Sequence, residues 1–307
     1  MKKSRGGESM ASTKEIKKRI SSVKNTQKIT NAMYLISSTK MRKAKNDLDQ
    51  TRPYFQALQG EIKRIFRTAG NVESRYFYPA DDTKVLDGTY GCLVITADKG
   101  LAGAYNHNVL LEAQRMYNEH TDMKLFVVGE YGRQFFLRHH IPIEKSFLYT
   151  AQNPTMQRAR EIAEILLELF DEGKLEKIYI IYTDLESGME EEAKSTRLLP
   201  FHRKQFASSA SERAVSRPFE FQPSIQTVLD NIMHSYISGY IYSALIDSFC
   251  SEQTARMTAM DSANRNAQKI LDELSVQYHL VRQAAITQEI TEVSAGAKAQ
   301  KKKKRRK

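Results

Sequence analysis

The residues best suited to chemistry by type and spacing form a glycine-containing turn at residues 98–106, DKGLAGAYN, directly after an apolar run. Glycines in such a turn let backbone amides approach a phosphate, so a nucleotide site is the first possibility to consider. The turn nevertheless contains neither the Walker pattern nor the complete glycine fingerprint of dinucleotide-binding folds. We therefore expect neither a nucleotide site nor a bound cofactor in this chain.

Other reactive side chains also lack the spacing that catalysis requires. The seven histidines show no HExxH or similar metal-ligand pattern, and no serine stands in the context of a hydrolase nucleophile. His139 and His140 precede an Ile-Pro pair and are expected in a loop. Cys92 and Cys250 are expected to be buried, inert thiols in a reducing compartment. The sequence therefore predicts no catalytic residue, no metal and no small-molecule substrate.

The positive charge of the chain is concentrated in two places. The formal net charge is +11, of which the all-basic residues 301–307 supply seven, leaving +4. Between residues 14 and 45, ten lysines and arginines occur with one acid, Glu15. Such a stripe suits an anionic partner, which is nucleic acid, lipid headgroups or an acidic protein surface; a solvated helix face is the alternative.

Two long helix-prone segments lie at the ends of the chain, and the basic stripe at residues 14–45 belongs to the first of them. The first has a 3.5-residue period of seam positions, namely Ile16, Ile20, Val23, Gln27, Thr30, Tyr34, Ser37, Met41, Ala44 and Leu48. The second keeps the same period at Ala263, Ala267, Ile270, Leu274, Gln277, Val281, Ala284, Gln288 and Thr291. Both segments therefore look like partners in one coiled coil. An ordinary helical bundle is the alternative, disfavoured because about 150 residues of different sequence intervene.

The sequence between the helices predicts a small α/β domain. Apolar strands are expected at residues 91–98, 124–129 and 177–184, with a further strand at 196–200 after an acidic loop at 190–192. Helices are expected between them, at residues 108–119 and 155–172. Strands that alternate with helices in this way are typical of a largely parallel sheet.

The complete division of the chain follows from these patterns. We expect a disordered N-terminal extension at residues 1–11, helices at 12–67 and 223–294, the α/β domain at 68–222, and a disordered basic tail at 295–307. The mean hydropathy is −0.53. The apolar runs fall well short of the roughly 20 residues that span a bilayer, and the start of the chain lacks the apolar stretch of a signal peptide.

Three separated motifs closely resemble the gamma subunit of F-type ATP synthases. The first consists of residues 21–33, SSVKNTQKITNAM, with 38–44, STKMRKA. The second is the turn at 98–106, and the third consists of residues 251–261, SEQTARMTAMD, with 282–292, RQAAITQEITE. The resemblance extends from about Met10 to Gly296 and keeps the order of the motifs.

This resemblance implies a rotor shaft. The terminal helices would form an antiparallel coiled coil inside a ring of three alpha and three beta subunits. A Rossmann-like central α/β domain, inserted between them, would sit on the epsilon subunit and the membrane ring of c subunits. The chain would couple ion flow to ATP synthesis or hydrolysis without catalytic residues of its own. It would lie peripherally on the cytoplasmic side of a bacterial cell membrane, and the coupling ion stays open.

The resemblance also implies which residues touch the ring. The candidates are Met33, Lys40, Arg42, Arg256, Arg282, Gln283, Thr287 and Glu289, each with a structural role in the coiled coil as the alternative. The cations of the first helix would meet an acidic loop of the beta subunits.

Two questions stay open at the level of sequence. The basic tail is either an extension that contacts an acidic surface at the crown of the ring or an idle solvated segment. The rival function is a coiled-coil protein that binds nucleic acid through its basic first helix and tail. That function calls for aromatic residues among the cations, and between residues 14 and 45 only Tyr34 is available. We therefore expect no nucleic-acid partner.

Overall fold

The computed structural model describes residues 13–69, 74–78, 88–120, 122–148, 150–184, 193–202, 206 and 220–304, with the side chains of 69 and 299–304 left out. The expected extension at 1–11, the acidic loop at 190–192 and residues 305–307 lie outside this description. The chain divides into two compact units. The first contains the residues up to Leu35 and from Ala259 onward, and the second contains Ile36–Thr258.

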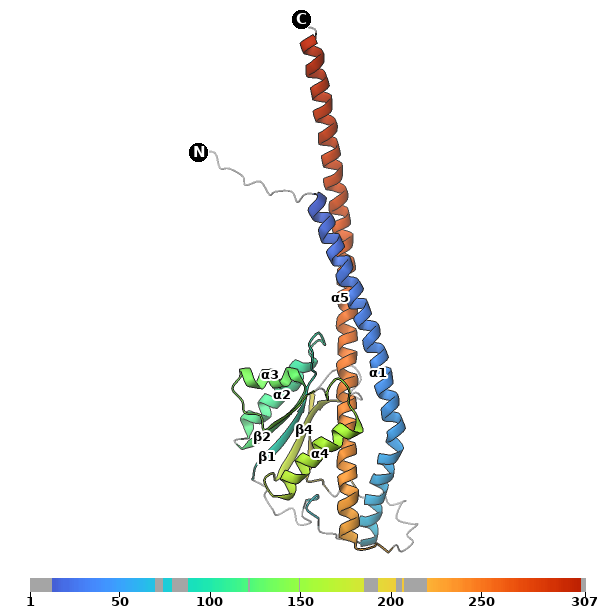
Figure 1. The fold of residues 1–307 in the computed structure, drawn as a ribbon, viewed down its shortest axis with the longest axis vertical. Coiled ribbons are helices and arrows are strands. Elements are labelled where there is room, and N and C mark those ends of the chain that lie inside the picture. The colour runs from blue at the N-terminus through green and yellow to red at the C-terminus, as the bar shows by residue number, and fades with distance from the viewer. Residues whose placement is uncertain are drawn as a thin grey trace. The chain divides into compact units, whose positions relative to one another are not determined.

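The described residues form helices and strands in one order along the chain (Figure 1). The elements are α1 (Thr13–Ala69), β1 (Tyr90–Ile95), α2 (Tyr105–Glu119), β2 (Met123–Val128), α3 (Glu130–Arg138), β3 (Lys145–Phe147), α4 (Met156–Asp171), β4 (Lys177–Thr183), β5 (Ala193–Leu199) and α5 (Ile225–Lys304).

The first unit contains the beginning of α1 and the end of α5. Gln27 Nε2 donates a hydrogen bond to Gln268 Oε1 at 3.3 Å, and Thr30 Oγ1 donates one to Asn264 Oδ1. Along α1, the seam positions predicted from the sequence are all buried or half-buried, with Ile16 3% exposed. The 3.5-residue period of this helix therefore coincides with its less exposed side.

On α5 five of the nine predicted seam positions are exposed. Ile270 and Gln277 are exposed, and the neighbouring Leu271 and Tyr278 take their places beside the buried Leu274. Each pair offers two adjacent residues that fit a 3.5-residue period, so the period alone does not decide which of them packs. Toward the C-terminus the side chains of residues 282–298 are all exposed, including the expected seam positions Ala284, Gln288 and Thr291.

The helix α5 also ends later than predicted. It continues to Lys304, whereas the sequence pattern predicts a helix that ends at residue 294 and a disordered tail after it. Ala297, Lys298 and the following lysines are strong helix formers, and Gly296 alone costs only about 1 kcal/mol. The expected tail and the structure therefore differ over residues 295–304, which are helical here.

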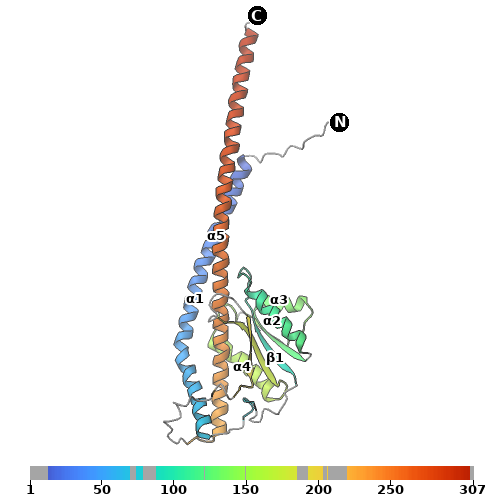
Figure 2. The ribbon, with the colours of Figure 1, turned by 180° about the vertical axis from the view of Figure 1, so that it is seen from behind.

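The second unit contains a five-stranded sheet with the order β3-β2-β1-β4-β5. β1 is parallel to both β2 and β4, β3 is parallel to β2, and β5 is antiparallel to β4. Helices cover both faces of the sheet (Figures 1 and 2). The predicted parallel strands are confirmed, each within a few residues of its expected position.

Alternating residues of the strands supply two separate cores. Leu93 and Ile95 of β1 face a cluster shared with α4, α1 and α5, whereas Cys92 and Val94 face a cluster shared with α2 and α3. Within this unit α1 and α5 approach closely at Gly239, because a Cβ placed there would lie 1.8 Å from Phe55 Cε1. Gly239, in the N-terminal part of α5, thus makes room for an aromatic ring of α1.

Two short elements were not predicted from the sequence, α3 and β3. Two glycines, Gly129 and Gly132, border or interrupt α3, which weakens its helical signal. β3 has three residues, too few to show a period. His139 follows α3 directly, and His140 adopts a positive φ of 55°, so both lie in the turn that was expected there.

Candidate functional site

Most of the residues proposed as ring contacts present their side chains to solvent. In the first unit Met33 of α1 is half-buried. Four candidates on α5 in the same unit are exposed, namely Arg282, Gln283, Thr287 and Glu289. The Thr287 hydroxyl donates to the Gln283 carbonyl at 2.9 Å, one turn back along the helix. In the second unit Lys40 and Arg42 are exposed on α1. Seven of the eight candidates are therefore at least partly exposed.

Arg256 differs from the other candidates because its side chain is buried inside the chain. It is 8% exposed, and its Nη2 lies 2.5 Å from Glu252 Oε1 one turn earlier on α5. The same nitrogen donates to the backbone carbonyls of Gly100, at 3.2 Å, and Lys99, at 3.5 Å. The guanidinium thus links α5 to the glycine-containing turn at residues 98–106.

The carboxyl group of Glu252 shares this buried environment. Glu252 is 6% exposed, and burial raises the pKa of its carboxyl. The neighbouring Arg256 opposes that shift, and the charge of Asp98 adds to it. The charges of Arg256, Asp98 and Lys40 thus all act on this carboxyl, where the turn and α5 come together.

The turn packs against α5 through uncharged groups as well. The Tyr105 hydroxyl and the Ser248 hydroxyl of α5 form a hydrogen bond of 2.6 Å, and both residues are almost fully buried. Ala102 and Tyr105 join Ala255 of α5 in a small buried cluster. Gly103, with a φ of 53°, provides a left-handed position that closes the turn.

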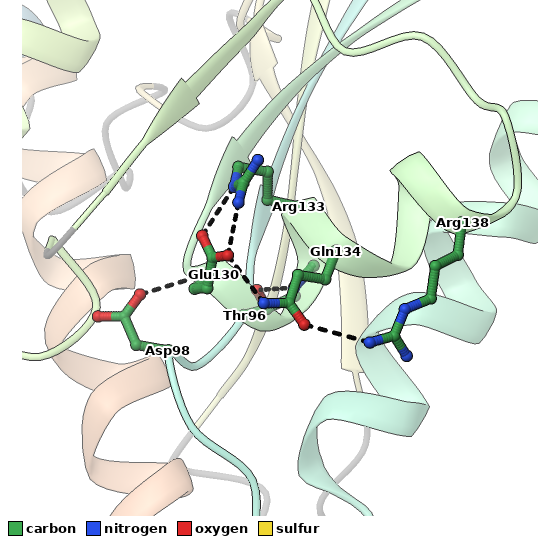
Figure 3. Close-up of polar contacts among 7 residues, drawn as sticks. Thr96, Asp98, Glu130, Arg133, Gln134 and Arg138 are labelled. Atoms are coloured by element: carbon green, nitrogen blue, oxygen red, sulfur yellow. Dashed lines mark hydrogen bonds and ion pairs between the residues drawn. The ribbon is translucent and has the colours of Figure 1, made fainter.

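A second polar network holds the base of the turn to the start of α3 (Figure 3). Asp98 Oδ1 accepts a hydrogen bond from the Glu130 backbone amide at 2.9 Å, and Thr96 Oγ1 accepts one from the Gly132 amide at 3.0 Å. Arg133 binds the Glu130 carboxylate through two nitrogens, at 2.6 and 2.7 Å. These hydrogen bonds from Arg133 lower the pKa of Glu130 to about 2. The residues of the turn are thus used to join structural elements.

The two cysteines are placed as buried structural residues. Cys92 and Cys250 are both free and buried, as predicted. Burial raises the pKa of Cys250 to about 11 and that of Cys92 further, so neither thiol ionises readily. Among the residues that the structure describes, no three His, Cys, Asp or Glu side chains gather as a metal site would require. No described helix is long and apolar enough to cross a membrane.

One cavity of about 480 Å³ lies in the second unit, between α1, β4 and α5. Its lining combines two cations, Lys45 and Arg52, with three carboxylates, Asp49, Asp184 and Asp247. A phosphate site gathers backbone amides and positive charge, whereas here acids outnumber the bases. The cavity therefore offers no cradle for a nucleotide.

Sequence reasoning missed the internal role of Arg256. A signal was available, because Glu252 and Arg256 are spaced four residues apart in the order that favours an ion pair on a helix. The carbonyl acceptors at Lys99 and Gly100 carried no such signal, since backbone acceptors are identical at every position. The hydrogen bond between Tyr105 and Ser248 was equally invisible.

Comparison with known proteins defines the class to which this arrangement belongs. A family model described as ATP synthase matches residues 12–300, nearly the whole chain. The "ATP synthase gamma chain" of Caldanaerobacter subterraneus is 42% identical over 293 residues, which cover 92% of this chain and 98% of that protein. The protein of the same name from Acetivibrio thermocellus is 39% identical, over 95% of this chain and 100% of its own. The chain therefore belongs to the ATP synthase gamma chain family.

Solved structures support the same fold. A chain from the central stalk and c-ring of the Tetrahymena thermophila mitochondrial ATP synthase matches with a TM-score of 0.55 and 25% identity, covering 76% of this chain and 99% of that one. A chain of the Euglena gracilis mitochondrial ATP synthase has a TM-score of 0.65 over 94% of both chains. At 15% identity, that second match speaks for the fold alone.

Proposed function

We propose that this chain is the central rotor shaft of an F-type ATP synthase, which couples ion flow through a membrane sector to ATP synthesis or hydrolysis on a ring of alpha and beta subunits. The observation that carries the proposal is the family match over residues 12–300. The chain itself supplies no catalytic group under this proposal. It controls the rate of ATP turnover and of ion flow by its orientation.

We propose further that α1 and α5 form an antiparallel coiled coil. Gln27 bonds to Gln268 and Thr30 bonds to Asn264, so residue numbers rise along one helix as they fall along the other. The α/β domain is Rossmann-like under this proposal, which the strand order β3-β2-β1-β4-β5 supports. The functional division follows the predicted boundaries at residues 12–67, 68–222 and 223–294.

The exposed end of α5 supports a partner that surrounds it. Between residues 282 and 298 every side chain is exposed, and Ile290 and Val293 are 64% and 73% exposed. Apolar side chains along a helix without a packed face indicate a surface that another protein covers. A ring of alpha and beta subunits would supply that cover.

The proposed ring contacts explain how rotation would change affinity at a catalytic site. To move a site from 1:99 to 99:1 between two states, the shaft must contact those states differently by about 5.5 kcal/mol. Exposed cations such as Lys40 and Arg42 contribute only about 0.2–1 kcal/mol each to an ion pair. Many weak contacts, made and broken in turn, therefore suit a moving shaft better than one strong contact.

The candidates for these contacts are the exposed residues Lys40, Arg42, Arg282, Gln283, Thr287 and Glu289 and the half-buried Met33. Arg256 is buried and contacts the turn at residues 98–106 of this chain, so we assign it no direct contact with the ring. The alternative of a nucleic-acid protein gains no support, because Tyr34 is half-buried on the seam of α1 and so is poorly placed for stacking on bases.

Partners and location follow from the same proposal. The alpha and beta subunits would surround the coiled coil, and the epsilon subunit and c-ring would bind the α/β domain. The protein would be peripheral to a bacterial cell membrane on its cytoplasmic side, which agrees with the bacterial sources of its relatives. A relative from Acetobacterium woodii is named "sodium ion specific", so sodium ions are a candidate for the coupling ion alongside protons.

The experiment that tests this proposal is reconstitution with the matching alpha and beta subunits. We expect one copy of this chain to copurify with the ring and to be required for steady ATP hydrolysis. The double variant K40Q/R42Q should weaken association with the ring by up to about fivefold for each charge removed. R265Q is the matched control, because Arg265 is also exposed on a long helix but is not a proposed contact. Absence of any complex with the wild-type chain would overturn the proposal.

A further inference from the structure

The carboxyl ends of β1 and β4 form the position at which a parallel α/β sheet usually binds its ligand. β1 lies between β2 and β4 and is parallel to both. The helix that follows β1 belongs to one core, whereas the helix that precedes β4 belongs to the other. The chain therefore changes direction across the sheet at this point, and such switch points leave a crevice outside the strand ends.

In this protein the crevice is taken by α5. The Ser251 hydroxyl donates a hydrogen bond to the Thr183 carbonyl, at the end of β4, over 3.3 Å. The Ser248 hydroxyl bonds to Tyr105 in the turn that follows β1. Ser248 and Ser251 are 1% and 4% exposed. The helix thus lies where a bound molecule would otherwise lie, against both strand ends.

Arg256 supplies the charged contact in this arrangement. Its guanidinium donates to the carbonyls of Lys99 and Gly100 and forms an ion pair with the Glu252 carboxylate one turn earlier on α5. A guanidinium has several donors in a fixed plane, so one side chain can bind a carboxylate and backbone carbonyls at once. Charge-assisted hydrogen bonds of this kind are about twice as strong as neutral ones.

We propose that Arg256 is a positioning residue that fastens the turn at residues 98–106 to α5, so that torque applied to the α/β domain reaches the helix through this contact. The proposal rests on the proposed function as a rotor shaft. It assigns to Arg256 a role inside the chain, in place of the direct ring contact that the sequence suggested.

Hydrogen exchange in the assembled complex tests the fastening itself. In R256Q we expect backbone amides of residues 99–108, including those of Tyr105 and Asn108, to exchange about tenfold faster than in the wild type. Amides of β2 should be unchanged. R265Q is the matched control, since Arg265 also pairs with an acid four residues earlier on α5 but is exposed. Unchanged exchange at residues 99–108 in R256Q would overturn the proposal.

Ion pumping tests the consequence for torque. With the complex reconstituted in vesicles with its membrane sector, R256Q should continue to hydrolyse ATP but lose ATP-driven ion pumping, whereas R265Q should retain both. Faster exchange with the wild-type number of ions pumped per ATP would overturn the torque role. If the wild-type complex itself fails to pump, the proposed function is wrong, and the exchange experiment still decides whether Arg256 fastens the turn.

A second variant covers the case in which R256Q fails to fold or assemble. R256K keeps the positive charge beside Glu252 but replaces the planar fork with a single ammonium group. We expect exchange rates between those of the wild type and a tenfold increase, with partial loss of pumping. Wild-type values for both quantities in R256K would show that the guanidinium geometry has no such role.

Discussion

The close approach of α1 and α5 at Gly239 gives the sharpest prediction of this structure. An alanine Cβ at position 239 would lie 1.8 Å from Phe55 Cε1 and 2.0 Å from Cδ1, whereas ordinary contacts begin at 3.4 Å. The Phe55 ring must therefore move by about 1.6 Å, or the helices must separate. Overpacking of this kind costs about 1–3 kcal/mol.

Alanine also brings a gain, which a matched variant can isolate. In the middle of a helix alanine is about 0.5–1 kcal/mol more favourable than glycine. Gly60 lies inside α1, and a Cβ placed there meets nothing within 4 Å. G60A should therefore show the gain alone, and G239A should be less stable than G60A by about 2 kcal/mol.

Urea denaturation followed by far-ultraviolet circular dichroism measures this difference. We expect the midpoint to rise for G60A and to fall for G239A relative to the wild type, with similar slopes. In an F55L background the smaller side chain should remove at least half of the cost of G239A, because the two residues are in direct contact. Equal stability of G239A and G60A would refute the packing inferred for α1 and α5 in this unit.

Three further predictions concern the α/β domain. G129A should destabilise the chain by about 3 kcal/mol in denaturation experiments, because Gly129 has a φ of 96° and its Cβ would lie 2.3 Å from the Thr96 carbonyl oxygen; wild-type stability would contradict that geometry. Arg133 lowers the pKa of Glu130 to about 2, so its ionised carboxylate stabilises the fold above the unfolded pKa of about 4.3, and this contribution is lost as pH falls toward 2. The difference in melting temperature between wild type and E130Q should accordingly shrink between pH 6 and pH 3, and a constant difference would refute the ion pair. Cys92 and Cys250 should resist a thiol reagent at pH 8 until the chain is unfolded, and rapid labelling of Cys92 in the folded protein would contradict its complete burial.

The elements that the sequence predicts well are those with a long repeating pattern. The seam of α1 recurs from Ile16 to Leu48, long enough for a 3.5-residue period to be distinguished from chance. The buried strands β1, β2 and β4 appear as short apolar runs between polar turns, which a parallel sheet requires. Both signals come from residues close together in the sequence, so they can be recognised without knowledge of the fold.

The features that the sequence does not predict depend on contacts between distant residues. Leu271 and Ile270 are both apolar, and only the packing partner decides which of them faces the seam. α3 starts at Glu130, whose backbone amide donates a hydrogen bond to the Asp98 carboxylate. The beginning of this helix therefore depends on a residue in another turn. The position of Arg256 as a ring contact was suggested by family resemblance, whereas its acceptors are backbone carbonyls that no sequence pattern marks.

The proposed ring contacts are intermediate between these cases. Lys40, Arg42 and the polar residues near the end of α5 could be expected at the surface, because charged side chains are rarely buried without a partner. Their exposure agrees with a contact surface but is shared by many other residues of the same helices. Only assembly with the ring separates residues that touch it from residues that face water.

The most direct test of the central proposal is single-molecule rotation. A bead is attached to the α/β domain of the wild-type chain, and the complex with its alpha and beta subunits is fixed to a surface by the ring. A rotor shaft predicts stepwise rotation in one direction that starts when ATP is added and stops when ATP is removed. A complex that assembles and hydrolyses ATP while the bead shows only random motion would contradict the proposal.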